Sequence, residues 1–216
     1  MAALLGLAAT TVPASADLTW TLKAGSLAPA GTVYGTVKAH QVNSTTVEIT
    51  IQLAPKNYLL STGSHVGIAW DMSVVPDSVT IVTQNAPVHS DASQFTVDAL
   101  NGNYGDPGFG NFNYAITPNA SSGGSGTENS IVFDITKAGG LTLTAGLFPS
   151  NGGARWAADI GYNCTGSPGQ LSCSGTGVVA TNDVPVPEPG TWTMSIAGLA
   201  GLSFLMLQRR RKLARA

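Results

Sequence analysis

The stretch VEITIQL, from Val47 to Leu53, alternates apolar and polar residues without an exception. Successive side chains of a β-strand point to opposite faces of its sheet, so a period of two predicts a strand with one buried face. The same alternation recurs along the chain, in Leu18/Trp20/Leu22, Val66/Ile68/Trp70/Met72, Phe95/Val97/Ala99, Phe112/Tyr114/Ile116, Ile131/Phe133/Ile135, Leu141/Leu143 and Trp156/Ala158/Ile160/Tyr162. These segments predict a series of short strands.

Clusters of Gly, Pro, Asn and Ser separate these segments, as in NGNYGDPGFGN and PNASSGGSGTENS. Between the two terminal segments, no window shows a sustained helical repeat of about 3.6 residues. We therefore expect an all-β fold for residues 17–182, an antiparallel β-sandwich with jelly-roll-like topology, in one domain long enough to bury a sizeable core. The pattern leaves the strand order open, and a barrel is the alternative.

The C-terminal residues 191–207 carry no formal charge and are mostly apolar. A helix of this length spans about 25 Å at roughly 1.5 Å per residue, slightly less than the ~30 Å hydrocarbon core of a bilayer. The residues that follow, 208–216, include a cationic cluster of Arg209, Arg210, Arg211, Lys212 and Arg215. Such a cluster acts as a stop-transfer signal and stays on the cytoplasmic side. We predict a single transmembrane helix at 191–207 with a basic cytoplasmic tail; a helix buried in the core is the alternative.

The N-terminal residues resemble an export signal. Residues 2–12 form a short apolar run, and Ala14 and Ala16 are the small residues that signal peptidase requires at positions −3 and −1. We predict a signal helix at residues 1–16, with cleavage before Asp17. No Lys or Arg precedes the apolar run, so we expect the true start codon to lie upstream or the sequence to be truncated. A first core strand is the alternative.

The charges divide the chain into two opposed parts. Five of the 10 Lys and Arg residues follow Leu207, whereas all 12 Asp and Glu residues precede Gly190. The part predicted to be exported therefore carries a formal charge of −7. A phosphate-binding surface needs clustered Lys and Arg, so nucleic acid is not an expected partner.

Pro187, Glu188 and Pro189 directly precede the hydrophobic span and its Arg-rich end. This order of motif, span and basic cluster resembles the PEP-CTERM protein-sorting signal of Gram-negative bacteria, over residues 184–216. The resemblance implies export through the Sec translocon, cleavage by signal peptidase, and processing near the motif by an exosortase-like membrane protease. We predict that residues 183–190 form a Pro-rich linker that carries this motif; a linker without a sorting role, ahead of an ordinary membrane anchor, is the alternative.

The same resemblance implies the fate of the protein. It predicts a type I intermediate in the inner membrane, held by the C-terminal helix, and then transfer to the cell surface or the extracellular matrix, or secretion. Association with extracellular polysaccharide would follow from such a location. Prolines keep the segment extended, which suits a peptide that lies in a protease cleft.

The two cysteines, Cys164 and Cys173, flank a turn at Pro168-Gly169. Two nearby cysteines in an exported chain predict a disulfide. A zinc site needs further Cys or His residues nearby, and the sequence has none there. We therefore expect neither a metal nor a cofactor.

The sequence shows no catalytic motif. The three histidines, His40, His65 and His89, lie in separate segments, and Gly-x-Ser-x-Gly does not occur. A pair of carboxylates for glycoside hydrolysis stays open, because the separation of two carboxylates is a property of the fold.

The loop from Asp98 to Asn111 holds oxygen ligands in Asp98, Asn101, Asn103 and Asp106. It lacks the residue order and the closing Glu of an EF-hand, so we predict a turn and leave a calcium site open. Its aromatic residues, Tyr104 and Phe109, offer stacking faces for sugars.

Two functions follow from these observations. The first is a non-catalytic surface or matrix protein that is sorted through its C-terminal motif. The second is a surface-displayed hydrolase or glycan-binding module that acts on matrix polysaccharide. Two acidic side chains in an aromatic-lined groove would favour the second function, and a filled surface would favour the first.

Overall fold

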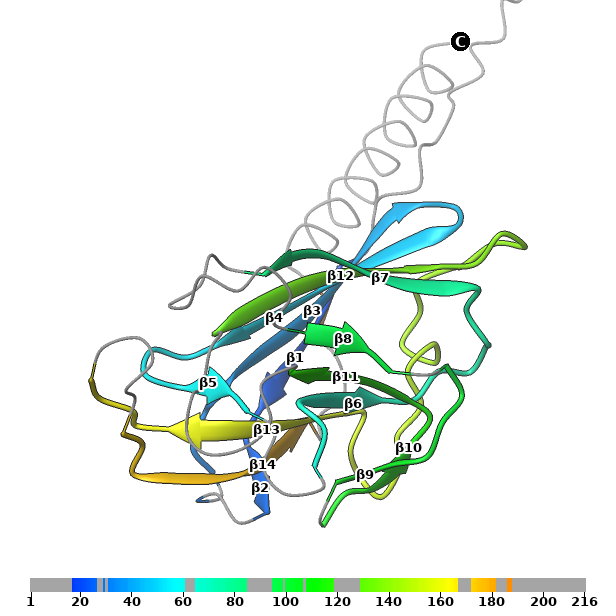
Figure 1. The fold of residues 1–216 in the computed structure, drawn as a ribbon. Coiled ribbons are helices and arrows are strands. Elements are labelled where there is room, and N and C mark those ends of the chain that lie inside the picture. The colour runs from blue at the N-terminus through cyan, green and yellow to red at the C-terminus, as the bar shows by residue number, and fades with distance from the viewer. Residues whose placement is uncertain are drawn as a thin grey trace, which may run out of the picture.

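A computed structural model describes residues 17–26, 29, 31–60, 65–84, 95–98, 100–106, 108–118, 129–166, 172–181 and 186–187. These residues form two antiparallel β-sheets that pack face to face (Figure 1). The prediction of an all-β antiparallel fold is therefore confirmed, whereas a jelly-roll-like strand order stays a prediction. The described part of the chain includes no helix long and apolar enough to cross a membrane.

Several predicted segments lie outside the described residues. These are the signal helix at 1–16 with Ala14 and Ala16, the transmembrane helix at 191–207, and the basic tail at 208–216. They stay predictions.

Sheet A, as described, has six strands in the order β15-β1-β3-β4-β12-β7. Their bounds are β15 Val186–Pro187, β1 Leu18–Leu22, β3 Gly35–Asn43, β4 Thr46–Leu53, β12 Ser130–Thr136 and β7 Ser78–Gln84. The opening segment VEITIQL forms most of β4 and pairs with β12 from Val47 to Gln52. Its alternation is matched by burial, because Val47, Ile49 and Ile51 are buried while Glu48 and Thr50 are only half-buried.

Sheet B has the order β2-β14-β13-β6-β11-β8, and β5 also pairs with β13. Their bounds are β2 Ala24–Ser26, β14 Gly175–Thr181, β13 Trp156–Tyr162, β6 Ile68–Trp70, β11 Tyr114–Pro118, β8 Phe95–Val97 and β5 Tyr58–Leu59. A separate hairpin, β9 Tyr104–Asp106 with β10 Gly110–Phe112, completes the described strands.

The core lies between the inner faces of the two sheets. Trp20 of sheet A has its ring centroid 6.1 Å from that of Trp156 in sheet B. Phe133 of sheet A lies 5.1 Å from Trp70 of sheet B, measured in the same way. These rings are fully buried, and aromatic side chains of this size contribute a large share of the burial energy of a core.

Two details of the predicted strand pattern are wrong. Leu141 and Leu143 are buried in a loop rather than in a strand, because their N–H groups bond to Ser44 O at 2.8 Å and to Gln41 Oε1 at 2.5 Å. Phe112 belongs to β10 and packs outside sheet B, whereas Tyr114 turns into the core. A bend at Asn113 separates the two rings.

Candidate functional site

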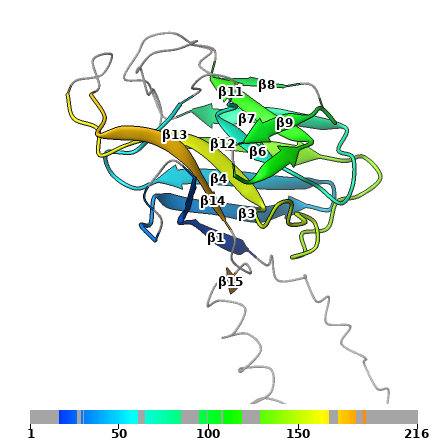
Figure 2. The same ribbon diagram turned by 90° about the horizontal axis from the view of Figure 1, so that it is seen from below.

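Strand β15 pairs with the outer edge of β1, and Figure 2 shows the two strands side by side. The register places Leu18 opposite Pro187 and Thr19 opposite Val186. These two C-terminal residues lie within the segment 183–190 that the sequence predicts to be a linker. A proline has no N–H to donate to a ladder, so sheets accommodate it on edge strands such as this one.

The antiparallel pairing brings two distant parts of the chain to one place. Because β1 and β15 run in opposite directions, the chain enters β1 at the same end at which it leaves β15 after Pro187. Asp17, the first residue after the predicted signal cleavage site, therefore lies beside the first proline of the predicted sorting motif. Glu188 and Pro189 lie outside the described residues.

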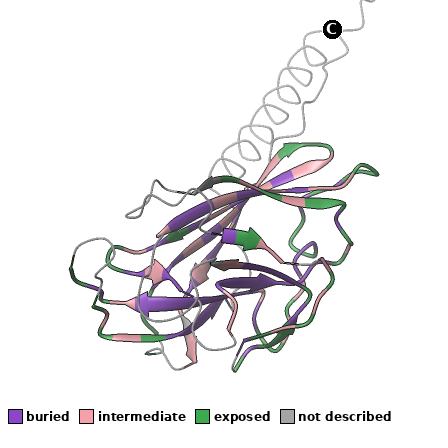
Figure 3. Ribbon diagram, viewed as in Figure 1, coloured by how far each residue is buried: buried purple, intermediate pink, exposed green. Residues whose placement is uncertain are grey.

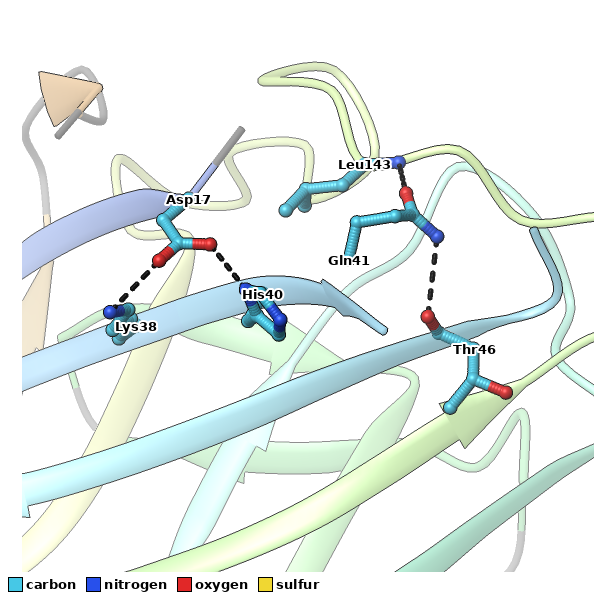
Figure 4. Close-up of polar contacts among 6 residues, drawn as sticks. All are labelled: Asp17, Lys38, His40, Gln41, Thr46 and Leu143. Atoms are coloured by element: carbon cyan, nitrogen blue, oxygen red, sulfur yellow. Dashed lines mark hydrogen bonds and ion pairs between the residues drawn. The ribbon is translucent and has the colours of Figure 1, made fainter. Parts of the chain in front are cut away.

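Asp17 fixes the beginning of β1 to its neighbour β3. Its carboxylate lies 2.9 Å from Lys38 Nζ and 2.5 Å from His40 Nδ1 (Figure 4). Burial acts to raise the pKa of Asp17, but hydrogen bonds and charges from His40 and Lys38 outweigh burial and lower that pKa. The ionised carboxylate thus holds the edge strand at the point where β15 docks.

Gln41, one residue further along β3, holds the loop next to this edge. Its amide nitrogen donates to Thr46 O at 3.2 Å, and its oxygen accepts from Leu143 N, as Figure 4 shows. The same nitrogen donates to Leu141 O at 2.8 Å. These bonds join the β3–β4 turn to a segment about a hundred positions later in the chain.

Residues 185–212 match the family model of the PEP-CTERM protein-sorting motif. The chain carries a PEP-CTERM sorting motif. No curated protein and no solved structure matches the chain. The motif implies export, sorting to the cell surface and exosortase-related processing. The predicted resemblance is thereby confirmed over the sorting segment, of which the structure describes Val186 and Pro187.

The disulfide between Cys164 and Cys173 is also confirmed. It closes the connection between β13 and β14, where Thr165 and Ser172 bond to each other through their backbones at 2.8 Å. Cys164 N donates to Lys56 O at 2.8 Å, which ties the same connection to the segment before β5.

A second candidate site lies under the β9–β10 hairpin, on the outer face of sheet B. Phe109 and Phe112 of the hairpin pack there against small side chains, namely Ala69, Ala154, Ala157, Val178 and Ala180. Gly108 has φ +86°, so the tight turn suits a residue without a Cβ. A Cβ on Gly152 would lie 2.2 Å from Phe109 O, which shows how closely the neighbouring turn packs on the hairpin.

Two buried carboxylates lie close together at this hairpin, Asp106 from β9 and Asp159 from β13, and His65 from the segment before β6 approaches Asp159. Asp106 is 2% exposed and Asp159 is 0% exposed. His65 Nδ1 lies 3.8 Å from Asp159 Oδ2. Neither oxygen of Asp106 has a hydrogen-bond partner among the described residues. Burial, and then the charge of Asp159, raise the pKa of Asp106 to about 7.

These carboxylates differ from those of an open hydrolytic site. A general acid must reach its substrate within hydrogen-bond distance, and both Asp106 and Asp159 are shielded from solvent. Among the described residues, no group of three or more His, Cys, Asp and Glu side chains is placed to hold a metal ion.

The loop from Asp98 to Asn111 does not gather its oxygen ligands into one site. Asp98 accepts a hydrogen bond from Thr117 Oγ1 at 2.6 Å, whereas Asp106 points beneath the hairpin toward Asp159. Asn101 and Asn103 are exposed. Phe109 is 9% exposed, so its ring serves packing and does not present a face to sugars.

The histidines are not brought together either. His40 lies on the outer face of sheet A beside Asp17, while His65 lies on the outer side of sheet B. His89 lies outside the described residues.

A shallow hollow opens where β3 begins and β4 ends. It is lined by Val33, Gly35, Thr36, Gln52, Leu53, Ala54, Pro55 and Asn129. None of these side chains titrates and none is aromatic, so the hollow lacks both the acidic pair and the ring faces that the hydrolase hypothesis requires.

Asp159 was not predicted as a site residue, although the segment WAADIGY indicates that the outer face of this strand is covered. Ala157, Asp159 and Gly161 occupy the positions that alternate with the core residues of β13. Small residues at outward positions of a strand indicate that something packs closely on that face.

Proposed function

We propose that this chain is an exported, non-catalytic surface or extracellular-matrix protein whose C-terminal motif is processed by an exosortase-like protease. The Sec translocon would export the chain, and signal peptidase would cleave it before Asp17. The helix predicted at 191–207 would hold a type I intermediate in the inner membrane. Processing near Pro187–Pro189 would then transfer the β-sandwich to the surface or the matrix, or release it.

The observation that carries this proposal is the sorting motif at residues 185–212. Two structural features support it. The disulfide Cys164–Cys173 suits an oxidising compartment outside the cytoplasm. The pairing of Leu18 with Pro187 brings the beginning of β1 and the end of β15 together, which suits a precursor whose two predicted membrane segments, before Asp17 and after Pro187, would enter the same bilayer.

The burial of two acidic residues supports the non-catalytic role. Asp106 and Asp159 are the close carboxylates that a hydrolase hypothesis would use, and the hairpin buries both. A stable domain that binds matrix polysaccharide or holds it together needs no such site. We infer that the β-sandwich has a structural role at the cell surface or in the matrix, to which the sorting motif directs it.

The intact mass of the protein tests the sorting step. The full chain is expressed in a host that has an exosortase, and the protein is recovered from the cell envelope and the medium. We expect a product that begins at Asp17, ends near Pro189 and is two hydrogens lighter than its reduced form. A variant with Pro187, Glu188 and Pro189 replaced by Ala, and the wild type in a host without exosortase, should keep residues 209–216. A wild type that keeps its tail in the first host would contradict the proposal.

A surface-displayed hydrolase is the alternative, favoured only by the proximity of Asp106 and Asp159. The release of reducing ends from purified matrix polysaccharide tests it. The alternative requires that wild-type protein releases them and that Asp159→Asn does not. Equal, background release from both proteins would support the non-catalytic role.

A further inference from the structure

The pairing of β15 with β1 joins the sorting segment to the folded domain. We propose that the outer edge of β1 is a docking strip for residues 186–187, and that the sorting protease binds the motif only after β15 has left this strip. The proposal rests on the proposed function, because it concerns how the same sorting segment becomes accessible.

Few backbone contacts hold β15 in the docked state. Two register pairs join the strands, Leu18 with Pro187 and Thr19 with Val186. Adjacent pairs of an antiparallel ladder alternate between hydrogen-bonded and non-hydrogen-bonded geometry, so β15 includes at most one hydrogen-bonded pair. Pro187 adds no donor of its own. A binder with more backbone contacts can therefore displace β15.

The docked state also uses the groups that a protease needs. Extended peptides are commonly recognised through main-chain hydrogen bonds to the edge of a strand. The backbone groups of Val186 that bond to β1 cannot bond to a protease at the same time. Docking and recognition of these residues are therefore mutually exclusive, and the docked segment is protected from other proteases of the compartment.

The strip itself is held firmly. Asp17 is anchored to Lys38 and His40, and β1 pairs with β3 over its full length from Leu18 to Leu22. Displacement of β15 thus leaves β1 in sheet A. The movable element is the C-terminal strand, and the edge that receives it is part of the rigid domain.

A disulfide staple tests this proposal. Register partners in antiparallel strands have Cα atoms about 4.5–5.5 Å apart, within the range that a disulfide spans. The double variant Thr19→Cys/Val186→Cys should therefore form a disulfide in the full-length, detergent-solubilised protein. The matched control Thr21→Cys/Val186→Cys is two residues out of register, and diagonal partners lie about 7–8 Å apart, so its thiols should not couple. Peptide mapping checks that Cys164 and Cys173 remain paired with each other.

The stapled chain is then placed in membranes that contain exosortase. We expect at least a tenfold lower rate of tail removal than in the single variants Thr19→Cys and Val186→Cys, and recovery when a reductant opens the staple. Processing of the stapled chain at the rate of the single variants would overturn the proposal, and so would a failure of the in-register thiols to couple. The coupling does not depend on exosortase. A wild type that keeps its tail while the in-register thiols couple would therefore contradict the proposed function and leave the docking strip supported.

Discussion

The outer faces of the two sheets differ, although both sheets share one core (Figure 3). On sheet A, outward residues such as Glu48, Thr50 and Gln52 are half-buried or exposed. On sheet B, the outward residues Ala157 and Asp159 are 0% exposed, because the β9–β10 hairpin covers them.

The difference teaches that alternation reports the inner face of a strand and says little about what covers the outer face. In both β4 and β13, every second residue is apolar and faces the core. Only the small residues at the outward positions of β13 distinguish a covered face from an open one. Covering a face also buries polar groups, which explains why burial raises the pKa of Asp106, a hairpin residue close to Asp159 of sheet B.

Removing the aromatic cover should have the largest effect. Phe112→Ala leaves a cavity between the hairpin and sheet B, and truncation of a buried Phe typically costs about 3–5 kcal/mol of unfolding free energy. Urea unfolding measures the loss. The matched control Val132→Ala, on the half-buried outer face of sheet A, should cost under about 1 kcal/mol. Equal losses from the two variants would contradict the comparison.

The dependence of stability on pH should come next. The pKa of Asp106 is about 7 in the folded protein against an ordinary value of 3.8, so the folded state binds more protons between these values. The contribution of Asp106 to the unfolding free energy is therefore fully present below pH ~4. It is lost as the pH rises through about 7, and the loss from this group amounts to up to roughly 4 kcal/mol.

Asp106→Asn tests this sign. The variant cannot ionise, so the difference in unfolding free energy between variant and wild type should shift in favour of the variant between pH 5 and pH 8. His65 and Asp159, two other ionisable side chains on this side of sheet B, are present in both proteins. A difference that is constant with pH would show that Asp106 is ionised throughout.

Loss of the disulfide should have a smaller effect. In the loop-entropy model, closing the connection between Cys164 and Cys173 contributes about 2.5–3 kcal/mol. The variant Cys164→Ser/Cys173→Ser should unfold at correspondingly lower urea concentration. Hydrogen exchange should rise first at the β13–β14 end of sheet B, while β4 and β12 of sheet A stay protected. Uniform loss of protection would contradict this localisation.

A charge on the open face should have the smallest effect. Thr50 lies half-buried on the outer face of sheet A, opposite Lys38 on β3. Thr50→Glu should change the unfolding free energy by no more than about 0.5 kcal/mol. The same charge at Ala157 would be buried beneath the hairpin and should cost several times as much. Thermal unfolding of both variants at low salt gives the comparison.

Sequence reasoning identified the fold class from local signals. VEITIQL and Ile131–Ile135 predict β4 and β12 well, because one face of each strand is buried and the other is open. The disulfide could be predicted because the two cysteines lie close together in the sequence, on either side of a turn. The sorting motif was recognised from the order of three adjacent segments.

The remaining features depend on contacts between distant residues. β14 has the sequence GTGVVAT, which does not alternate because both of its faces are covered. Asp106 meets Asp159 only because a hairpin folds back over β13. The proline content of the segment around Pro187 is typical of a linker, and its pairing with Leu18 joins residues from opposite ends of the domain.

The pairing of Leu18 with Pro187 also makes the domain a natural candidate for circular permutation. A short linker can join the two ends where β1 and β15 meet, and the chain can be opened at the exposed turn Asn43–Ser44 between β3 and β4. Such a permutant would keep both sheets. Because Asp17, at the start of β1, lies beside His40 near the end of β3, the new chain ends would lie at the same end of the sandwich as the old ones, so the attached domain would keep its orientation while β3 and β4 took the place of β1 and β15 as the terminal strands.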